Sequence, residues 1–149
     1  MIKKFLLADD DEDDTNLFDE ALRKINSTIE FFSARNGKDM LDKLNAGKVE
    51  PQVIFLDINM PEMNGWEALE KIKKTSTLKD IPVIMYSTSS SARDGKKAVE
   101  SGALGFYEKP ASFLKLKDFL ALISASTVTE LASTMREISA SKEHKVYSG

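Results

Sequence analysis

Six consecutive acidic residues, 9–14, follow directly on the short apolar segment 5–8. Acids at the start of a helix complement its macrodipole and cap its free amides, which accounts for residues 11–14. Asp9 and Asp10 come straight after the apolar segment, so we expect them at the end of a strand. Carboxylates at such a point are ligands that Mg²⁺ prefers. The acidic run therefore predicts a helix start and, ahead of it, part of a metal site.

Two more polar residues follow apolar segments in the same way. Asp57 comes after the continuous apolar run 53–56, and Lys109 follows a short apolar segment near residue 106. If Asp57 lay beside Asp9, the carboxylates would repel each other unless a divalent cation neutralised them. A carboxylate can accept a phosphoryl group as an acyl phosphate, while cations offset the charge on the phosphoryl oxygens. These residue types predict metal-assisted phosphoryl transfer onto Asp57.

A calcium loop is an alternative interpretation of the acidic run. Asp9, Asp11, Asp13 and Glu20 have the spacing of the first, third, fifth and twelfth positions of an EF-hand loop. The sixth position of that loop requires glycine for its sharp turn, and Asp14 stands there. No helical pattern precedes the run, so the magnesium interpretation is favoured.

Short apolar segments alternate with helical patterns through the first 123 residues, in an order that predicts five strands and five helices. The expected strands lie near residues 5–8, 28–34, 53–56, 83–86 and 106–107. This alternation is typical of a doubly wound α/β fold, a parallel sheet with helices on both faces. Ligands bind such folds beyond the carboxyl ends of the strands. Asp9, Asp57, Ser87 and Lys109 all fall at these ends.

Residues 124–149 have a different composition, rich in serine and threonine. A capping-box pattern, Thr127-x-x-Glu130, precedes a stripe of apolar residues at helical spacing. The stripe consists of Val128, Leu131, Met135 and Ile138. We therefore expect one domain over residues 1–123 and an extension over 124–149, with a short amphipathic helix and a frayed end from about Ser141.

Composition excludes several classes of function. The net charge of −3 argues against nucleic acid or an anionic membrane as the main partner. There is no cysteine for a disulfide, a thiolate metal site or a nucleophile, and His144 is the single histidine. No apolar stretch approaches the roughly 18 residues of a membrane span. The sequence predicts a cytoplasmic protein.

The motifs, taken in order along residues 2–123, resemble the receiver domain of bacterial two-component response regulators, in particular its stand-alone, chemotaxis-type members. The matching pieces are Asp9-Asp10, Asp57-x-x-Met60-Pro61-x-x-x-Gly65, Ser87 after the segment 82–86, Gly102-Ala103 and Lys109-Pro110. The resemblance implies a flavodoxin-like sheet of five parallel strands in the order 2-1-3-4-5.

The resemblance also implies a role for each matching residue of the site. Asp57 would accept the phosphoryl group of a phosphohistidine, on a sensor histidine kinase or a phosphotransfer protein. Asp10 and Asp57 would ligate Mg²⁺ directly, together with the backbone carbonyl of Asn59, and Asp9 would act through water. Lys109 would hold the phosphoryl oxygens.

Further residues would respond to phosphorylation or shape the loops. Ser87 would swing to the phosphoryl group, although the hydroxyl run 87–91 offers other candidates, and Phe106 would follow as the switching aromatic. Thr88 departs from the family, which has a very small residue there, so its bulk is expected to alter phosphotransfer or hydrolysis. Structural roles fall to Pro61, Gly65 and Pro110, with a cis Lys109-Pro110 bond.

The predicted output is a contact of the fourth helix, fifth strand and fifth helix with a downstream protein, and a homodimer is possible. Two other functions stay open. A pseudo-receiver would bind partners without being phosphorylated. A phosphohydrolase with an aspartyl-phosphate intermediate would need an acid two residues after Asp57, where Asn59 cannot transfer protons.

Overall fold

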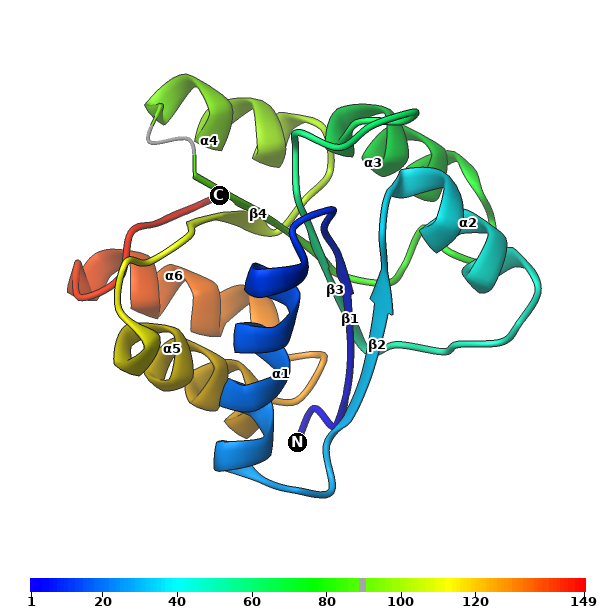
Figure 1. The fold of residues 1–149 in the computed structure, drawn as a ribbon. Coiled ribbons are helices and arrows are strands. Elements are labelled where there is room, and N and C mark those ends of the chain that lie inside the picture. Colours follow the sequence, from blue (N-terminus) through cyan, green and yellow to red (C-terminus); the bar gives the residue numbers. More distant parts are fainter. Residues whose placement is uncertain (89–90) are drawn as a thin grey trace.

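The computed structural model describes residues 1–88 and 91–149 as a six-stranded sheet between two layers of helices (Figure 1). The strands are β1 (Lys4–Ala8), β2 (Glu30–Ala34), β3 (Val53–Leu56), β4 (Val83–Ser87), β5 (Gly105–Glu108) and β6 (Val146–Ser148). The helices are α1 (Glu12–Ile25), α2 (Gly37–Asn45), α3 (Gly65–Lys74), α4 (Ala92–Glu100), α5 (Phe113–Ala125) and α6 (Leu131–Ser141).

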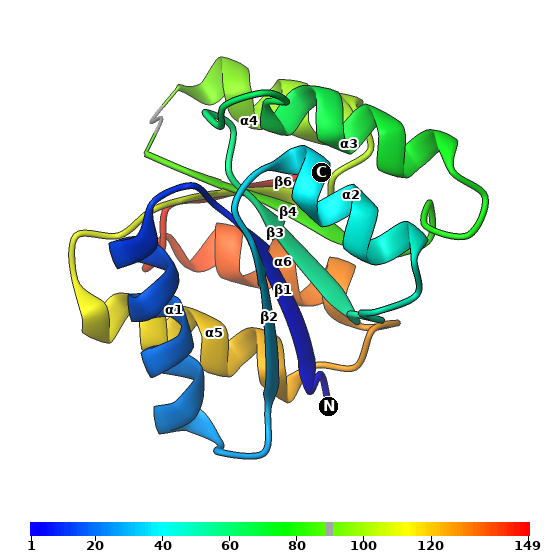
Figure 2. The ribbon, with the colours of Figure 1, turned by 45° about the vertical axis from the view of Figure 1, so that its right-hand side comes forward.

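Helices cover both faces of the sheet, with α1, α5 and α6 on one face and α2, α3 and α4 on the other (Figure 2). Alternate residues of β3 therefore enter two separate apolar cores. Phe55 packs with Phe18 of α1 and Phe119 of α5, whereas Ile54 packs with Leu69 of α3. A strand covered on both faces has no polar position, which explains the continuous apolar run that preceded Asp57 in the sequence.

The predicted α/β topology is confirmed. The sheet order is β2-β1-β3-β4-β5-β6, and the first five strands are parallel. Parallel strands place their carboxyl ends at one edge of the sheet, which we call the carboxyl edge, formed by the ends of β1, β3, β4 and β5 and the loops that follow. No helix within the described residues is long and apolar enough to span a membrane.

The extra helix after residue 124 is present as α6. Leu131, Met135 and Ile138 are buried against the core on the α5 side, as their spacing predicted. Val128 is 42% exposed, because it lies in the turn before α6 rather than on the helix. Thr127 and Glu130 exchange the predicted hydrogen bonds, each from backbone amide to side chain at 3.2 Å, but they close that turn ahead of α6.

The prediction of a frayed end from about Ser141 was wrong. Lys142 adopts a left-handed conformation with φ of 59°, and the chain turns back to form β6. β6 pairs antiparallel with β5, so the sheet has six strands instead of five. The free edge of β5 offers unpaired backbone groups to any nearby strand, and a three-residue strand is too short to give a readable periodicity.

Candidate functional site

The neighbouring strands β1 and β3 bring the predicted carboxylates together at the carboxyl edge. The backbone amide of Asp57 donates to the carbonyl of Ala8 at 2.9 Å, which places Asp57 beside Asp9. Oxygen atoms of Asp9, Asp10 and Asp57 all lie within 4.8 Å of one another. Asp9 and Asp57 are buried, whereas Asp10 is exposed. Two buried acids and one open to solvent therefore share a single small volume.

Lys109 reaches into this group from the end of β5. Its backbone amide donates to the carbonyl of Ser87 at 2.7 Å, which fixes the start of the loop after β5. Its Nζ lies 2.8 Å from Oδ2 of Asp9, 2.8 Å from Oδ2 of Asp14 and 3.7 Å from Oδ2 of Asp57. The ammonium is thus held by two carboxylates and stands close to a third.

Charge and burial shift the protonation of both groups. Burial, reinforced by the neighbouring Asp9 carboxylate, raises the pKa of Asp57 to about 7, while Lys109 acts in the opposite direction. Burial lowers the pKa of Lys109, but hydrogen bonds to Asp14 and Asp9 outweigh it and hold that pKa above its ordinary value. A buried carboxylate that is costly to ionise is one that a further cation would stabilise strongly.

The loop after Asp57 folds tightly back against that residue. Ile58 donates its amide to Oδ1 of Asp57 at 2.8 Å, and its carbonyl accepts from the amide of Gly65 at 2.8 Å. A Cβ on Gly65 would overlap the carbonyl oxygen of Asp57, so glycine is required there by close approach. Pro61 and Asn59 lie on this loop, exposed to solvent.

The residues proposed to respond to phosphorylation occupy different environments. Ser87 ends β4 with its Oγ buried and without a hydrogen-bond partner among the described residues. Phe106 is buried on β5, and Thr88 is exposed directly after Ser87. Of the other hydroxyls in the run, those at 89 and 90 lie outside the described residues. A buried unpaired hydroxyl is uncommon, and it leaves Ser87 free to donate to a group placed beside it.

The expected cis Lys109-Pro110 bond is not found, since the peptide bonds of residues 1–88 and 91–149 include no cis bond. The trans isomer is the lower in energy for an X-Pro bond, and the order of residues alone does not signal the rarer one. Lys109 reaches the carboxylates from the trans arrangement.

Two residues that contact Lys109 were not predicted. The acidic run predicted Asp14 only as part of the capped start of α1. The backbone amide of Asp14 does donate to Oδ1 of Asp11 at 3.1 Å, but the Asp14 carboxylate also pairs with Nζ of Lys109. Tyr86 places its ring 5.3 Å from Nζ of Lys109. Asp14 could have been found from its place one helical turn after Asp10, because the first turn of α1 faces the carboxyl edge.

The donors at the carboxyl edge suit Mg²⁺. Carboxylate oxygens are hard ligands, and a site with one or two protein carboxylates that is open to water and phosphate matches the usual binding of this ion. Asp10 provides the exposed side of the group and Asp57 the buried side. The residues present therefore fit a divalent cation at the position expected from the sequence.

Comparison with known proteins identifies the family. The model of the response regulator receiver domain matches residues 5–121. The chain belongs to this family. Receiver domains are modules of two-component signalling rather than classical enzymes, which opposes the phosphohydrolase alternative.

Two named proteins are similar in sequence to this receiver domain. The probable methanogenesis regulatory protein FilR2 of Methanothrix harundinacea is 32% identical over 116 residues, which cover 75% of each chain. A protein-glutamate methylesterase/protein-glutamine glutaminase of Methanococcoides burtonii is 33% identical over 110 residues. Those residues cover 70% of this chain but 30% of that protein, so related domains also occur within longer chains.

Two solved structures share the fold of this receiver domain. The phosphorylated cyanobacterial phytochrome response regulator RcpA matches with a TM-score of 0.74 and 30% identity, over 81% of this chain and 90% of that one. The Mn²⁺-bound form of response regulator Rcp1 matches with a TM-score of 0.70 and 30% identity, over 81% and 91% of the two chains.

Proposed function

We propose that this receiver domain accepts a phosphoryl group on Asp57 and changes its protein contacts in response. The observation that carries the proposal is the convergence of Asp57 with Asp9, Asp10 and Lys109, with Nζ of Lys109 3.7 Å from the Asp57 carboxylate. Phosphoryl transfer needs a positioned nucleophile and positive charge over the transferred oxygens. Both lie within one group of side chains.

In the transfer, an oxygen of Asp57 forms the bond to phosphorus, and the bond from phosphorus to the donor nitrogen of a phosphohistidine breaks. Asp9, Asp10 and Asp57, with the backbone carbonyl of Asn59, would hold Mg²⁺. The ion would supply positive charge to the carboxylates and the phosphoryl oxygens. Lys109 offsets the remaining charge, and the hydroxyl of Ser87 can donate to the product. That a phosphorylated response regulator and an Mn²⁺-bound one share the fold supports this assignment.

The partners follow from the chemistry. The donor would be a sensor histidine kinase or a phosphotransfer protein, and the target a downstream protein that contacts α4, β5 and α5. Homodimerisation through these elements or through the extension over 124–149 stays a prediction, and light scattering before and after phosphorylation tests it.

Intact-mass measurement with Mg²⁺ and acetyl phosphate tests the proposal. We expect the wild type to gain the mass of one phosphoryl group and Asp57→Asn to gain none. Asp19→Asn, which removes a partly exposed carboxylate on α1, is the matched control and should behave as the wild type. If the wild type gains no mass with any phosphodonor, the domain binds partners as a pseudo-receiver instead.

A further inference from the structure

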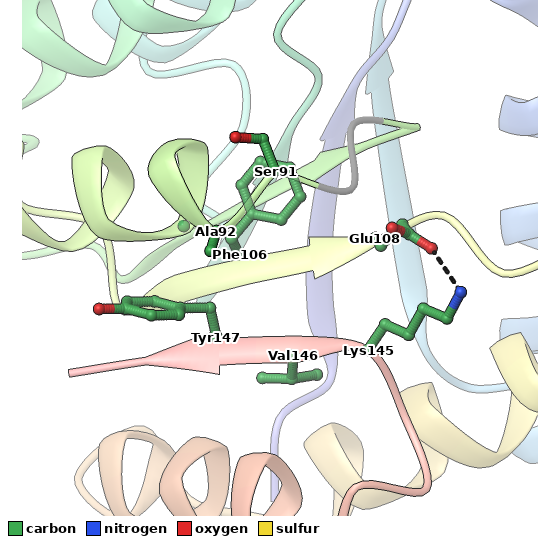
Figure 3. A pocket seen from close by; sticks show the side chains of 8 residues that line it. Ser91, Ala92, Phe106, Glu108, Lys145, Val146 and Tyr147 are labelled. Carbon is green, nitrogen blue, oxygen red and sulfur yellow. Dashed lines mark ion pairs between the residues drawn. The ribbon is translucent and has the colours of Figure 1, made fainter.

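The elements proposed for output are partly covered by the chain's own end, residues 145–148, which we call the tail strap. β6 lies antiparallel along β5, with Tyr147 opposite Phe106 (Figure 3). The amide of Glu108 donates to the carbonyl of Lys145 at 3.0 Å, and the Glu108 carboxylate lies 3.2 Å from Nζ of Lys145. The tail strap thus occupies the edge of β5 that a partner would otherwise meet.

The tail strap also contacts α4. A Cβ built on Gly95 would lie 2.7 Å from Cγ of Tyr147, so the tyrosine ring rests against the helix backbone where no side chain intervenes. Phe106, Ala92 and Tyr147 line a cavity of about 360 Å³ between α4 and the two strands (Figure 3). The tail strap therefore bridges β5 and α4 and fills the space between them incompletely.

One end of the tail strap is anchored in the core. His144, the residue before it, is buried with its ring centroid 5.7 Å from that of Phe119 and 6.4 Å from that of Tyr107. The hydroxyl of Ser139 donates to the carbonyl of Val146 at 3.1 Å. The other end is more open to solvent, because Tyr147 is 39% exposed. Such an arrangement can open from its far end while His144 stays in place.

One short path connects the carboxyl edge to the tail strap. It runs along β5, where Glu108, which pairs with Lys145, is the residue directly before Lys109. Ser87, whose Oγ has no partner among the described residues, is tied to the same strand end, because its carbonyl accepts from the backbone amide of Lys109 at 2.7 Å. A change at Lys109 or Ser87 therefore acts on the end of β5, which the tail strap contacts.

We propose that the tail strap is a built-in occupant of the output face and that phosphorylation of Asp57 displaces it; this rests on the function proposed above. When Lys109 turns from Asp9 and Asp14 to the phosphoryl oxygens, and Ser87 donates to them, the end of β5 shifts relative to α4. The tail strap contacts both elements, so it loses the fit that holds it. The displaced strap leaves the backbone groups of β5 open to a partner.

Hydrogen exchange measured by mass spectrometry tests the displacement in the full chain. We expect peptides covering β5 and β6 to exchange at least about tenfold faster in the presence of Mg²⁺ and acetyl phosphate. Peptides covering β1 and β2 should keep their rates. The intact mass of the same sample reports phosphorylation: no mass gain overturns the proposed function and this inference together. A mass gain with unchanged exchange at β5 and β6 overturns this inference alone.

Variants test the coupling in the reverse direction, because an effect of phosphorylation on the tail strap requires an equal effect of the strap on the phosphorylated state. Gly95→Ala adds a methyl group where the ring of Tyr147 lies, and Tyr147→Ala removes that ring. Both should bind beryllofluoride, a phosphoryl mimic, about three- to tenfold more tightly in the presence of Mg²⁺. Lys96→Ala, an exposed neighbour on α4, should bind as the wild type. Unchanged affinity in both strap variants would overturn the inference.

Discussion

The carboxyl edge and the β5–β6 edge of the sheet are stabilised in opposite ways. At the carboxyl edge, Asp9 and Asp57 are buried as acids around Lys109, whose side chain is 10% exposed. At the β5–β6 edge, backbone hydrogen bonds and aromatic contacts hold β6 in place, and the charged Lys145 is 80% exposed. The carboxylates at the carboxyl edge repel each other, and a bound cation would reduce this repulsion. The β5–β6 edge has no such cluster of like charges among the described residues, so it would respond only through changes in packing and hydrogen bonding. Under the proposed function, phosphorylation occurs at the carboxyl edge and changes protein contacts at the β5–β6 edge.

Replacing a lysine at each edge should separate them most strongly. Lys109→Met removes the ammonium proposed to offset the phosphoryl charge, and we expect phosphorylation by acetyl phosphate to slow by about 100-fold. Lys145→Met removes the ion pair with Glu108 in the tail strap, away from the carboxylates, and should not slow the reaction. Intact-mass spectrometry of samples quenched at successive times measures both rates. Equal losses in the two variants would contradict the division between the edges.

The extension over residues 124–149 should contribute to the free energy of unfolding through α6 and not through the turn before it. Leu131 is fully buried, so Leu131→Ala should lower the free energy of unfolding by about 3 kcal/mol. Val128 is 42% exposed. Val128→Ala should therefore stay within about 0.5 kcal/mol of the wild type. Urea unfolding measures the difference, and equal values would show that α6 is not part of the core.

The buried charge at the carboxyl edge should make stability depend on pH. The pKa of Asp57 rises from an ordinary value of 3.8 to about 7 on folding. The folded protein therefore keeps a proton that the unfolded chain releases, and the free energy of unfolding falls as pH rises through this window. In the presence of a chelator, Asp57→Asn should be more stable than the wild type above about pH 7, by about 2 kcal/mol, and the gap should close near about pH 4. A gap that is constant across this range would contradict the burial of an ionisable Asp57.

The smallest effect on the phosphorylation rate should come from Thr88, beside the carboxyl edge. Thr88 is exposed directly after Ser87. We expect Thr88→Ala to speed phosphorylation by acetyl phosphate about threefold, which corresponds to roughly 0.7 kcal/mol in the barrier. Thr77→Ala, at an exposed position outside the site, is the control. A rate that is unchanged or slower in Thr88→Ala would show that Thr88 does not restrict access.

The two edges also differ in how far the sequence predicts them. Apolar runs such as 53–56 mark central strands, and the polar residue that follows each run marks the carboxyl edge, so Asp9, Asp57 and Lys109 could be placed together. Local patterns do not report which of several neighbouring acids turns toward a distant lysine, and Asp14 was therefore missed. β6 was missed for a related reason. Its three residues form a strand only because the edge of β5 is open beside them, which is a tertiary cause.

The dependence of phosphorylation on Mg²⁺ tests the central claim most directly. With acetyl phosphate as donor, the rate should rise to saturation with Mg²⁺ and fall to background in a chelator. Asp10→Asn should raise the half-saturating Mg²⁺ concentration by at least about tenfold. Asp13→Asn, on the exposed face of the same acidic run, should leave it unchanged. A rate that is the same in Mg²⁺ and in chelator, or equal shifts in the two variants, would contradict a metal-assisted phosphoacceptor at Asp57.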